Sequence, residues 1–167
     1  METDLRRWMS LCEAGSDKPS DIETYLRDFY GVSNLRQEFM LGSCFDFSNV
    51  LHLMTGWPVW SSTVGIEAAN IRIHSIVKAP NFSKKFVDAN GYTDQDVIIA
   101  RTGFHRGNLK YNMLQKADPE PQTDVDTNRL AEYILTIPRP PFSEMAFRNL
   151  ALKRMPHLYR TPRSNLR

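Results

Sequence analysis

A cysteine, a histidine and an aspartate, in that chain order, are the residues with the most evident capacity for chemistry. Cys44 follows Gly42-Ser43 and begins an apolar stripe, so it falls in the first turn of a predicted helix. The unpaired N–H groups and the dipole of a helix start favour an anion, and a thiolate is such an anion. His74 lies in a segment rich in β-branched residues, and Asp88 lies in the next apolar segment. This order predicts a nucleophile, a base and a group that orients the base.

The two strand-like segments predict a hairpin that brings His74 and Asp88 together. The segment 71–78 is rich in β-branched residues, and the segment 86–90 is predicted to pair with it across a loop of about five residues. Closing the hairpin with Lys78 opposite Lys84 places His74 directly across from Asp88. The same register pairs Ile76 with Phe86 and Arg72 with Asn90. Because cross-strand Cβ atoms are about 5 Å apart, the carboxylate can accept the imidazole N–H and leave the other ring nitrogen for the thiol.

Each of these residues also has a purely structural interpretation. Cys44 can be a small core residue at a helix start, and His74 can be a satisfied strand histidine. Asp88 can begin the Asp-Ala-Asn-Gly turn with a side-chain bond to the backbone. A register slip of one residue would put His74 and Asp88 on opposite faces. The conjunction of the three favours catalysis, with Cys44 as nucleophile, His74 as base and Asp88 as the orienting group.

Other polar residues are weaker candidates. His52 lies eight residues past Cys44, about 80° around the helix and two turns away, so we expect it at the surface or boundary. His105 is expected to face solvent, and Cys12 lies on an apolar helical stripe as a small core residue. Gln37 and Asn34 are candidate oxyanion donors by chemistry only, and the backbone N–H of Cys44 is the other candidate. The sequence has no zinc-ligand spacing, phosphate-binding glycine loop or dinucleotide fingerprint, so we expect no metal and no cofactor.

The elements that must position these residues predict an α+β fold. Residues 32–41 are expected to be a connection, and 102–123 a loop with one short element at 109–114. We expect one domain over 1–156 and a basic, flexible tail over 157–167. Helices are predicted over 4–13, 21–30, 44–54 and 126–135, together with a short helix capped by Thr93 and one capped by Ser143 that stops near Pro156. Ser20 caps the helix over 21–30, and Gly31 and Gly56 end the helices over 21–30 and 44–54. Strands are predicted over 59–64, 71–78 and 86–90.

Composition narrows the class of protein. The chain has 167 residues, 41% hydrophobic and 24% charged, which suits one globular domain. It has no apolar run long enough to cross a bilayer, charges interrupt its first 15 residues, and its two cysteines form no disulfide framework. We therefore expect a protein without membrane contact that is cytoplasmic or is delivered into a host cell without a classical signal peptide.

Charge is unevenly distributed along the chain. The net charge is +2, but residues 145–167 carry six Lys and Arg residues and no acid. A basic tail can bind nucleic acid through its phosphates. No aromatic stacking platform accompanies it, so a solvated helix face followed by a frayed end is the preferred interpretation.

The motifs around the three residues resemble those of a known family. Residues 41–47, Leu-Gly-Ser-Cys-Phe-Asp-Phe, and 51–58, Leu-His-Leu-Met-Thr-Gly-Trp-Pro, look like the nucleophile helix of small papain-like thiol hydrolases of bacteria and their mobile elements. His74 and the segment 86–91 resemble the histidine strand and the aspartate turn of the same group. The resemblance covers roughly residues 39 to 100; the stretch between Pro58 and Ile71 has no clear match, and no side-chain oxyanion donor is identifiable ahead of Cys44.

The resemblance implies a papain-like α+β fold with the triad Cys44, His74 and Asp88. The activity it implies is that of a hydrolase or acyl-transferase acting on an amide, thioester or isopeptide bond in a protein or peptide, including a host protein. Peptidase, deamidase and transglutaminase differ only in leaving group and acceptor, and the residues do not separate them. The alternative is a non-enzymatic binding or inhibitor protein of a mobile element built on the same frame.

Overall fold

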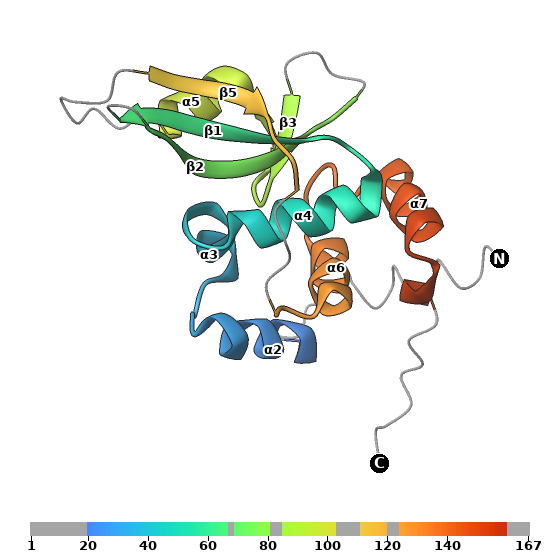
Figure 1. Ribbon diagram of the computed structural model, residues 1–167. Coiled ribbons are helices and arrows are strands. Elements are labelled where there is room, and N and C mark those ends of the chain that lie inside the picture. The colour runs from blue at the N-terminus through green and yellow to red at the C-terminus, as the bar shows by residue number, and fades with distance from the viewer. Residues whose placement is uncertain (1–19, 67–68, 81–84, 103–110, 120–123, 160–167) are drawn as a thin grey trace.

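The computed structural model describes residues 20–66, 69–80, 85–102, 111–119 and 124–159. Helices lie against one five-stranded antiparallel sheet, so the α+β class is confirmed (Figure 1). The helices are α2 (Asp21–Tyr30), α3 (Leu35–Leu41), α4 (Cys44–Thr55), α5 (Gln95–Thr102), α6 (Thr127–Thr136), α7 (Met145–Arg154) and the 3-10 helix η1 (Pro156–Tyr159). The strands are β1 (Val59–Ile66), β2 (Ala69–Lys78), β3 (Lys85–Asp88), β4 (Gly91–Asp94) and β5 (Tyr111–Lys116). Among these residues, no helix has the length and apolar character needed to cross a bilayer.

Local signals in the sequence set several helix ends where they were predicted. The Ser20 side chain accepts a hydrogen bond from the Glu23 N–H at 3.2 Å and starts α2. Gly31 and Gly56 end α2 and α4 in the left-handed conformation, with φ of 66° and 73°. Asp126 caps α6 by accepting from two N–H groups of its first turn. These positions confirm the predicted helices α2, α4 and α6.

The sheet has the strand order β4-β3-β2-β1-β5, and helices cover both of its faces. Successive strand residues point to opposite faces. Val77 of β2 belongs to the main core, which includes Phe47 and Leu51 of α4. Its neighbour Ile76 packs instead with Phe86 and with Ile98 of α5. Consequently α4 and α5 cover opposite faces of the sheet.

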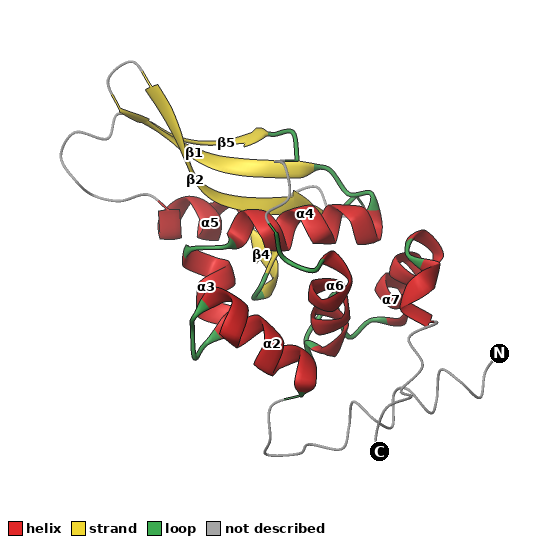
Figure 2. Cartoon of the chain, turned by 60° about the horizontal axis from the view of Figure 1, so that its bottom comes forward, coloured by secondary structure: helices red, strands yellow, loops and turns green. Residues whose placement is uncertain are grey.

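Helix α4 is the central element of the molecule. It lies between the sheet and the helices α6 and α7, with α2 on the far side of α6 (Figure 2). Phe47, Val50, Leu51 and Met54 are buried along it. A helix enclosed on several sides needs apolar residues around much of its circumference, and α4 has them. Its first residue, Cys44, is therefore held by packing along the length of the helix.

Three sequence predictions differ from the structure, and a fourth, the short element at 109–114, is present. The connection 32–41 contains α3, which Asn34 caps by accepting from the Gln37 N–H at 3.1 Å. Thr93 lies in strand β4 and does not cap a helix; α5 begins at Gln95. The short element predicted at 109–114 is confirmed as strand β5, two residues further along, which completes the sheet beside β1. Helix α7 begins after Glu144 and not after Ser143. Short elements were missed where their stability comes from tertiary packing and not from local sequence.

The register of the β2–β3 hairpin also differs from the prediction. Lys78 pairs with Phe86 and Val77 with Val87, so the predicted pairs of Lys78 with Lys84, Ile76 with Phe86, Arg72 with Asn90 and His74 with Asp88 are wrong by two residues. The last backbone bond between the two strands runs from Ala79 N to Lys85 O, which places two more residues between Lys78 and its partner than predicted. A shift of two preserves the face on which each side chain lies. His74 and Asp88 thus remain on one face as diagonal neighbours.

Some predictions fall outside the described residues. These are the helix over 4–13 with Cys12, the loop residue His105, and the basic tail from residue 160 onward. The domain boundary at 156 likewise stays a prediction.

Gly91 offers a test of how the β3–β4 turn is held. Its φ is 93°, and a Cβ there would collide with the carbonyl oxygen of Pro140. Gly31 has φ of 66° but no atom within 4 Å of the position of a Cβ. Gly31→Ala should therefore lose about 1 kcal/mol of unfolding free energy from the left-handed backbone alone. Gly91→Ala should lose roughly 1–3 kcal/mol more, because of the collision. Urea denaturation of both variants measures the difference, and equal losses would show that Pro140 does not constrain the turn.

Candidate active site

Cys44 is the first residue of α4 and is almost completely buried, with 2% of its surface exposed. The preceding residue, Ser43, gives the helix no side-chain cap. Its hydroxyl donates instead to Glu38 Oε1 at 2.7 Å. The start of α4 thus keeps backbone N–H groups that no Ser43 oxygen satisfies, next to the sulfur. This is the position predicted for Cys44.

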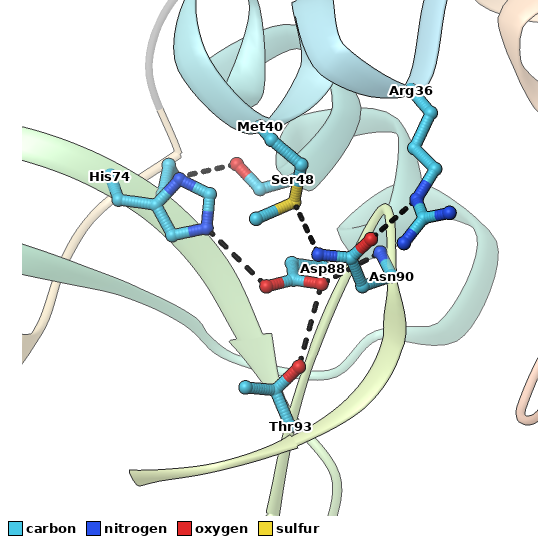
Figure 3. Close-up of polar contacts among 8 residues, drawn as sticks. Arg36, Met40, Ser48, His74, Asp88, Asn90 and Thr93 are labelled. Carbon is cyan, nitrogen blue, oxygen red and sulfur yellow. Dashed lines mark hydrogen bonds and ion pairs between the residues drawn. The ribbon is translucent and has the colours of Figure 1, made fainter. Parts of the chain in front are cut away.

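His74 on β2 and Asp88 at the end of β3 face each other within the protein. The distance from His74 Nε2 to Asp88 Oδ2 is 3.6 Å, that of an ion pair and longer than a short hydrogen bond (Figure 3). The two side chains are only 3% and 2% exposed. The diagonal register therefore still brings the two residues together. Because Nε2 faces the carboxylate, Nδ1 is the ring nitrogen available to another group.

The two carboxylate oxygens of Asp88 have different neighbours, which suit the turn role and the predicted orienting role. Its Oδ1 accepts hydrogen bonds from the Asn90 N–H at 2.7 Å and from the Thr93 hydroxyl at 3.5 Å. Its Oδ2 is the atom that faces His74. The two interpretations offered by the sequence are therefore compatible, because each uses a different oxygen. Bonds to Oδ1 fix the direction of Oδ2.

The electrostatics of His74 reflect both neighbours. Burial by itself lowers the pKa of His74, because a low-dielectric environment disfavours the charged ring. The interactions of the imidazolium with the Asp88 carboxylate and with the Cys44 sulfur outweigh burial and raise the pKa from 6.5 to about 9. Cys44 is therefore close enough to interact with His74. His74 and Asp88 thus form a buried pair, with the Cys44 sulfur near enough to affect the pKa of the ring, and at neutral pH the imidazole is protonated.

Hydrogen bonds fix the position of α4 relative to β2 beside this group. The Ser48 hydroxyl donates to the Phe45 carbonyl at 3.0 Å and lies 2.5 Å from the hydroxyl of Ser75. This hydrogen bond between the two hydroxyls joins α4 to β2. Ser75 adjoins His74, and Ser48 lies one turn past Cys44. The pair sets the distance between the helix carrying the sulfur and the strand carrying the imidazole.

Asn90 attaches the Asp88 turn to α3. Its Oδ1 accepts from Arg36 Nε at 2.5 Å, and its Nδ2 lies 3.3 Å from the sulfur of Met40 (Figure 3). The sequence analysis did not identify Arg36, Asn90 or Thr93 as supporting residues. The Asp-Ala-Asn-Gly turn was the one signal that pointed to Asn90. The partners on α3 could not be found without the missed helix.

The weaker candidates lie away from the buried group. His52 is half-buried near the other end of α4, where Nδ1 contacts the Trp57 carbonyl at 2.7 Å, as expected for a boundary residue. Asn34 and Gln37 are exposed, and Asn34 caps α3, so neither oxyanion candidate joins the group. Among the described side chains, no cluster of three or more His, Cys, Asp or Glu residues is arranged to hold a metal ion.

Two of the six bases counted toward the basic C-terminal segment have structural roles. Arg148 is buried and donates to the carbonyls of Phe142 and Leu135, each at 3.1 Å. Arg154 donates to the Leu53 carbonyl at 3.0 Å and so attaches α7 to the end of α4. Fewer of the six Lys and Arg residues are therefore available to bind a phosphate backbone than the sequence alone suggests.

The role of Asp88 predicts how its substitution acts on His74. Asp88→Asn keeps an oxygen for the Asn90 N–H but removes the negative charge that faces the ring. We expect the pKa of His74, about 9 in the native protein, to fall by roughly one unit or more. An NMR titration of the imidazole protons measures this, with His74→Gln to assign the signal. The same substitution at the exposed Asp94 is the matched control and should leave the titration unchanged. An unshifted titration in Asp88→Asn would contradict the orienting role.

The raised pKa also predicts a pH dependence of stability. The ordinary pKa of 6.5 applies to the unfolded chain and about 9 to the folded one, so protonated His74 stabilises the fold. This contribution is complete below pH 6.5 and is lost as the pH rises through 9, a change on the order of 3 kcal/mol. Urea denaturation at several pH values should show this loss in the native protein. In His74→Gln the fall over the same range should be smaller; an equal fall would contradict it.

Neither a scan of protein-family models nor searches of curated protein sequences and solved structures find a significant match to this chain. The functional argument consequently rests on the site itself.

Proposed function

We propose that this chain is a cysteine-dependent hydrolase or acyl-transferase that acts on an amide, thioester or isopeptide bond. The observation that supports it best is the buried pair of His74 and Asp88, 3.6 Å apart, with the Cys44 sulfur near enough to raise the pKa of the imidazole. A nucleophile, a base and a group orienting the base are what covalent catalysis by a thiol requires. Cys44 is the nucleophile, His74 the base and acid, and Asp88 the orienting group.

The architecture is consistent with a papain-like frame. A buried helix begins with the nucleophile and packs on an antiparallel sheet that carries the histidine. The aspartate follows on the neighbouring strand. We propose the papain-like assignment on this arrangement and on the resemblance of residues 39 to 100.

The mechanism follows from the protonation of the ring. Protonated His74 stabilises a thiolate at Cys44, which attacks the carbonyl carbon and forms a tetrahedral oxyanion. Nδ1 then gives its proton to the leaving group, and the carbon–heteroatom bond breaks to leave a thioester on Cys44. Neutral His74 takes a proton from a water or amine acceptor as that acceptor attacks the thioester. Release of the product restores the thiolate and the imidazolium.

The N-terminus of α4 is the candidate oxyanion site. Backbone N–H groups at a helix start can donate to a developing negative charge. Ser43 forms no side-chain cap at this helix, and its hydroxyl donates to Glu38. The backbone N–H of Cys44 is then the donor nearest to the reacting sulfur.

The proposed substrate is a protein or peptide, and a host protein is included in that class. The proposed location is the cytoplasm, or a host cell reached without a classical signal peptide. Peptidase, deamidase and transglutaminase activities all use the same acyl-enzyme and differ in the group that leaves and the group that accepts.

The burial of Cys44 favours a second candidate function. At 2% exposure, the sulfur meets a substrate carbonyl only after neighbouring groups move. A binding or inhibitor protein on the same frame needs no such movement, because its triad would be a structural remnant. The two functions differ in how the thiol reacts.

Alkylation of Cys44 distinguishes them. In a Cys12→Ser background, we expect iodoacetamide at about pH 6.5 to modify Cys44 at least about tenfold faster than in a His74→Gln variant, because the imidazolium favours the thiolate. Mass spectrometry of the alkylated peptide gives the rate.

His52→Gln is the matched control, since His52 lies on the same helix near its other end, where its ring contacts the Trp57 carbonyl. It should leave the rate unchanged. Equal rates with and without His74 would favour the binding protein over the enzyme.

A further inference from the structure

A pocket of about 190 Å³ lies beside the turn that carries Asp88, outside the buried triad. Its walls come from α2, α3, α6 and the segment that follows α6, and Ala89 of the turn forms part of its lining. The polar side chains that line it are those of Glu23, Arg36, Tyr133, Thr136 and Arg139. This volume is smaller than the roughly 300 Å³ at which pockets for drug-sized ligands begin. The pocket therefore suits a small ligand of a few heavy atoms.

The charges around the pocket favour an anion. Arg36 and Arg139 are positive, and Glu23 is the one acid of the lining. Glu23 already has a counter-charge, since its Oε2 lies 3.8 Å from Arg27 Nη2 on the next turn of α2. The two lining arginines are thus not neutralised by the lining itself.

Both arginines keep donors for a ligand. Arg36 donates through Nε to Asn90 Oδ1 at 2.5 Å, so its two terminal nitrogens take no part in that hydrogen bond (Figure 3). Within the described part of the chain, the Arg139 guanidinium forms no hydrogen bond or ion pair. A guanidinium presents parallel N–H donors that match the oxygens of a carboxylate or phosphate.

Tyr133 supplies a neutral donor to the same space. Burial, and then the charge of Glu23, raise the pKa of Tyr133 to about 12, and Arg139, Arg27 and Arg36 act in the opposite direction. The hydroxyl therefore lies within electrostatic range of the lining charges and remains protonated at neutral pH. A protonated hydroxyl can donate to an anion that the arginines hold.

We propose that this pocket binds a small oxyanion, a phosphate or carboxylate group, between Arg36 and Arg139, with the Tyr133 hydroxyl as an additional donor. The site is distinct from the triad, so the proposal does not depend on the proposed function.

Titration of the full chain with inorganic phosphate and, separately, with acetate tests the proposal. Isothermal titration calorimetry or NMR chemical shifts give Kd, with sodium chloride at matched ionic strength as the reference. We expect Kd for the tighter anion to rise at least about tenfold in Arg139→Gln and in Arg36→Gln, since each removes a charge-assisted contact. Tighter phosphate binding identifies a phosphate ligand, and tighter acetate binding identifies a carboxylate.

Arg129→Gln is the matched control for lost charge. Arg129 lies on α6 with Tyr133, but it pairs with Asp126 at 3.6 Å and stacks on Tyr25 at 4.5 Å, away from the pocket lining. Its Kd should stay within about twofold of the native value. The proposal is overturned if neither anion binds beyond the chloride reference. It is also overturned if Kd is unchanged in both pocket variants, or if Arg129→Gln weakens binding equally. Using two pocket variants keeps the test valid if one of them fails to fold.

Discussion

The arrangement of the candidate site depends on the Asp88 carboxylate, whose two oxygens have separate partners. Oδ1 is fixed by the Asn90 N–H and the Thr93 hydroxyl, and Oδ2 is thereby directed at His74. A buried carboxylate without such bonds would be strongly disfavoured. Here the turn supplies the bonds, and the imidazolium supplies the compensating charge. The same interaction with Asp88 contributes to the raised pKa of His74.

The sulfur reaches this pair because α4 is fixed at several points. Ser48 and Ser75 join it to β2, and Tyr30 donates to Asp46 in its first turn at 2.9 Å. Arg154 holds the carbonyl of Leu53 near its other end. Each contact comes from a different element, so the position of Cys44 results from the packing of the whole domain. This explains why the candidate site is built from residues that are far apart in the sequence.

Much of this could be predicted from the sequence because local rules governed it. Ser20, Gly31, Gly56 and Asp126 act within one or two turns of themselves, so their roles can be read from the sequence directly. The chain order of Cys44, His74 and Asp88 could also be recognised, because it is a property of the sequence itself. The register of the hairpin could not, because strand propensity does not determine how many residues the loop between two strands contains. The error was two residues, and an even shift keeps side chains on their predicted faces.

The missed elements were those whose stability comes from tertiary contacts. Helix α3 has seven residues, too few to be stable alone, and it forms where Phe39 packs into the core. Strand β4 is four residues long and gains its stability by joining the sheet. Strand β5 was predicted only as a short element, because its pairing with β1 is what makes it a strand. The supporting contacts of Arg36 and Asn90 depend on these elements, so they could not be inferred before the helix and the strands were known.

The close contact between the β3–β4 turn and the segment after α6 affects whether the site could be transferred to another protein. Tyr92 donates its N–H to the Pro140 carbonyl at 3.3 Å, and Gly91 is the residue that allows this close approach. All three candidate residues lie within a stretch of fewer than fifty residues. The turn that carries Asp88, however, contacts Pro140, which lies far beyond that stretch in the sequence. A transplant of that stretch into a foreign scaffold would carry the reactive groups without the brace that aims them. Such a graft would need a substitute for the Pro140 carbonyl before its histidine could be oriented.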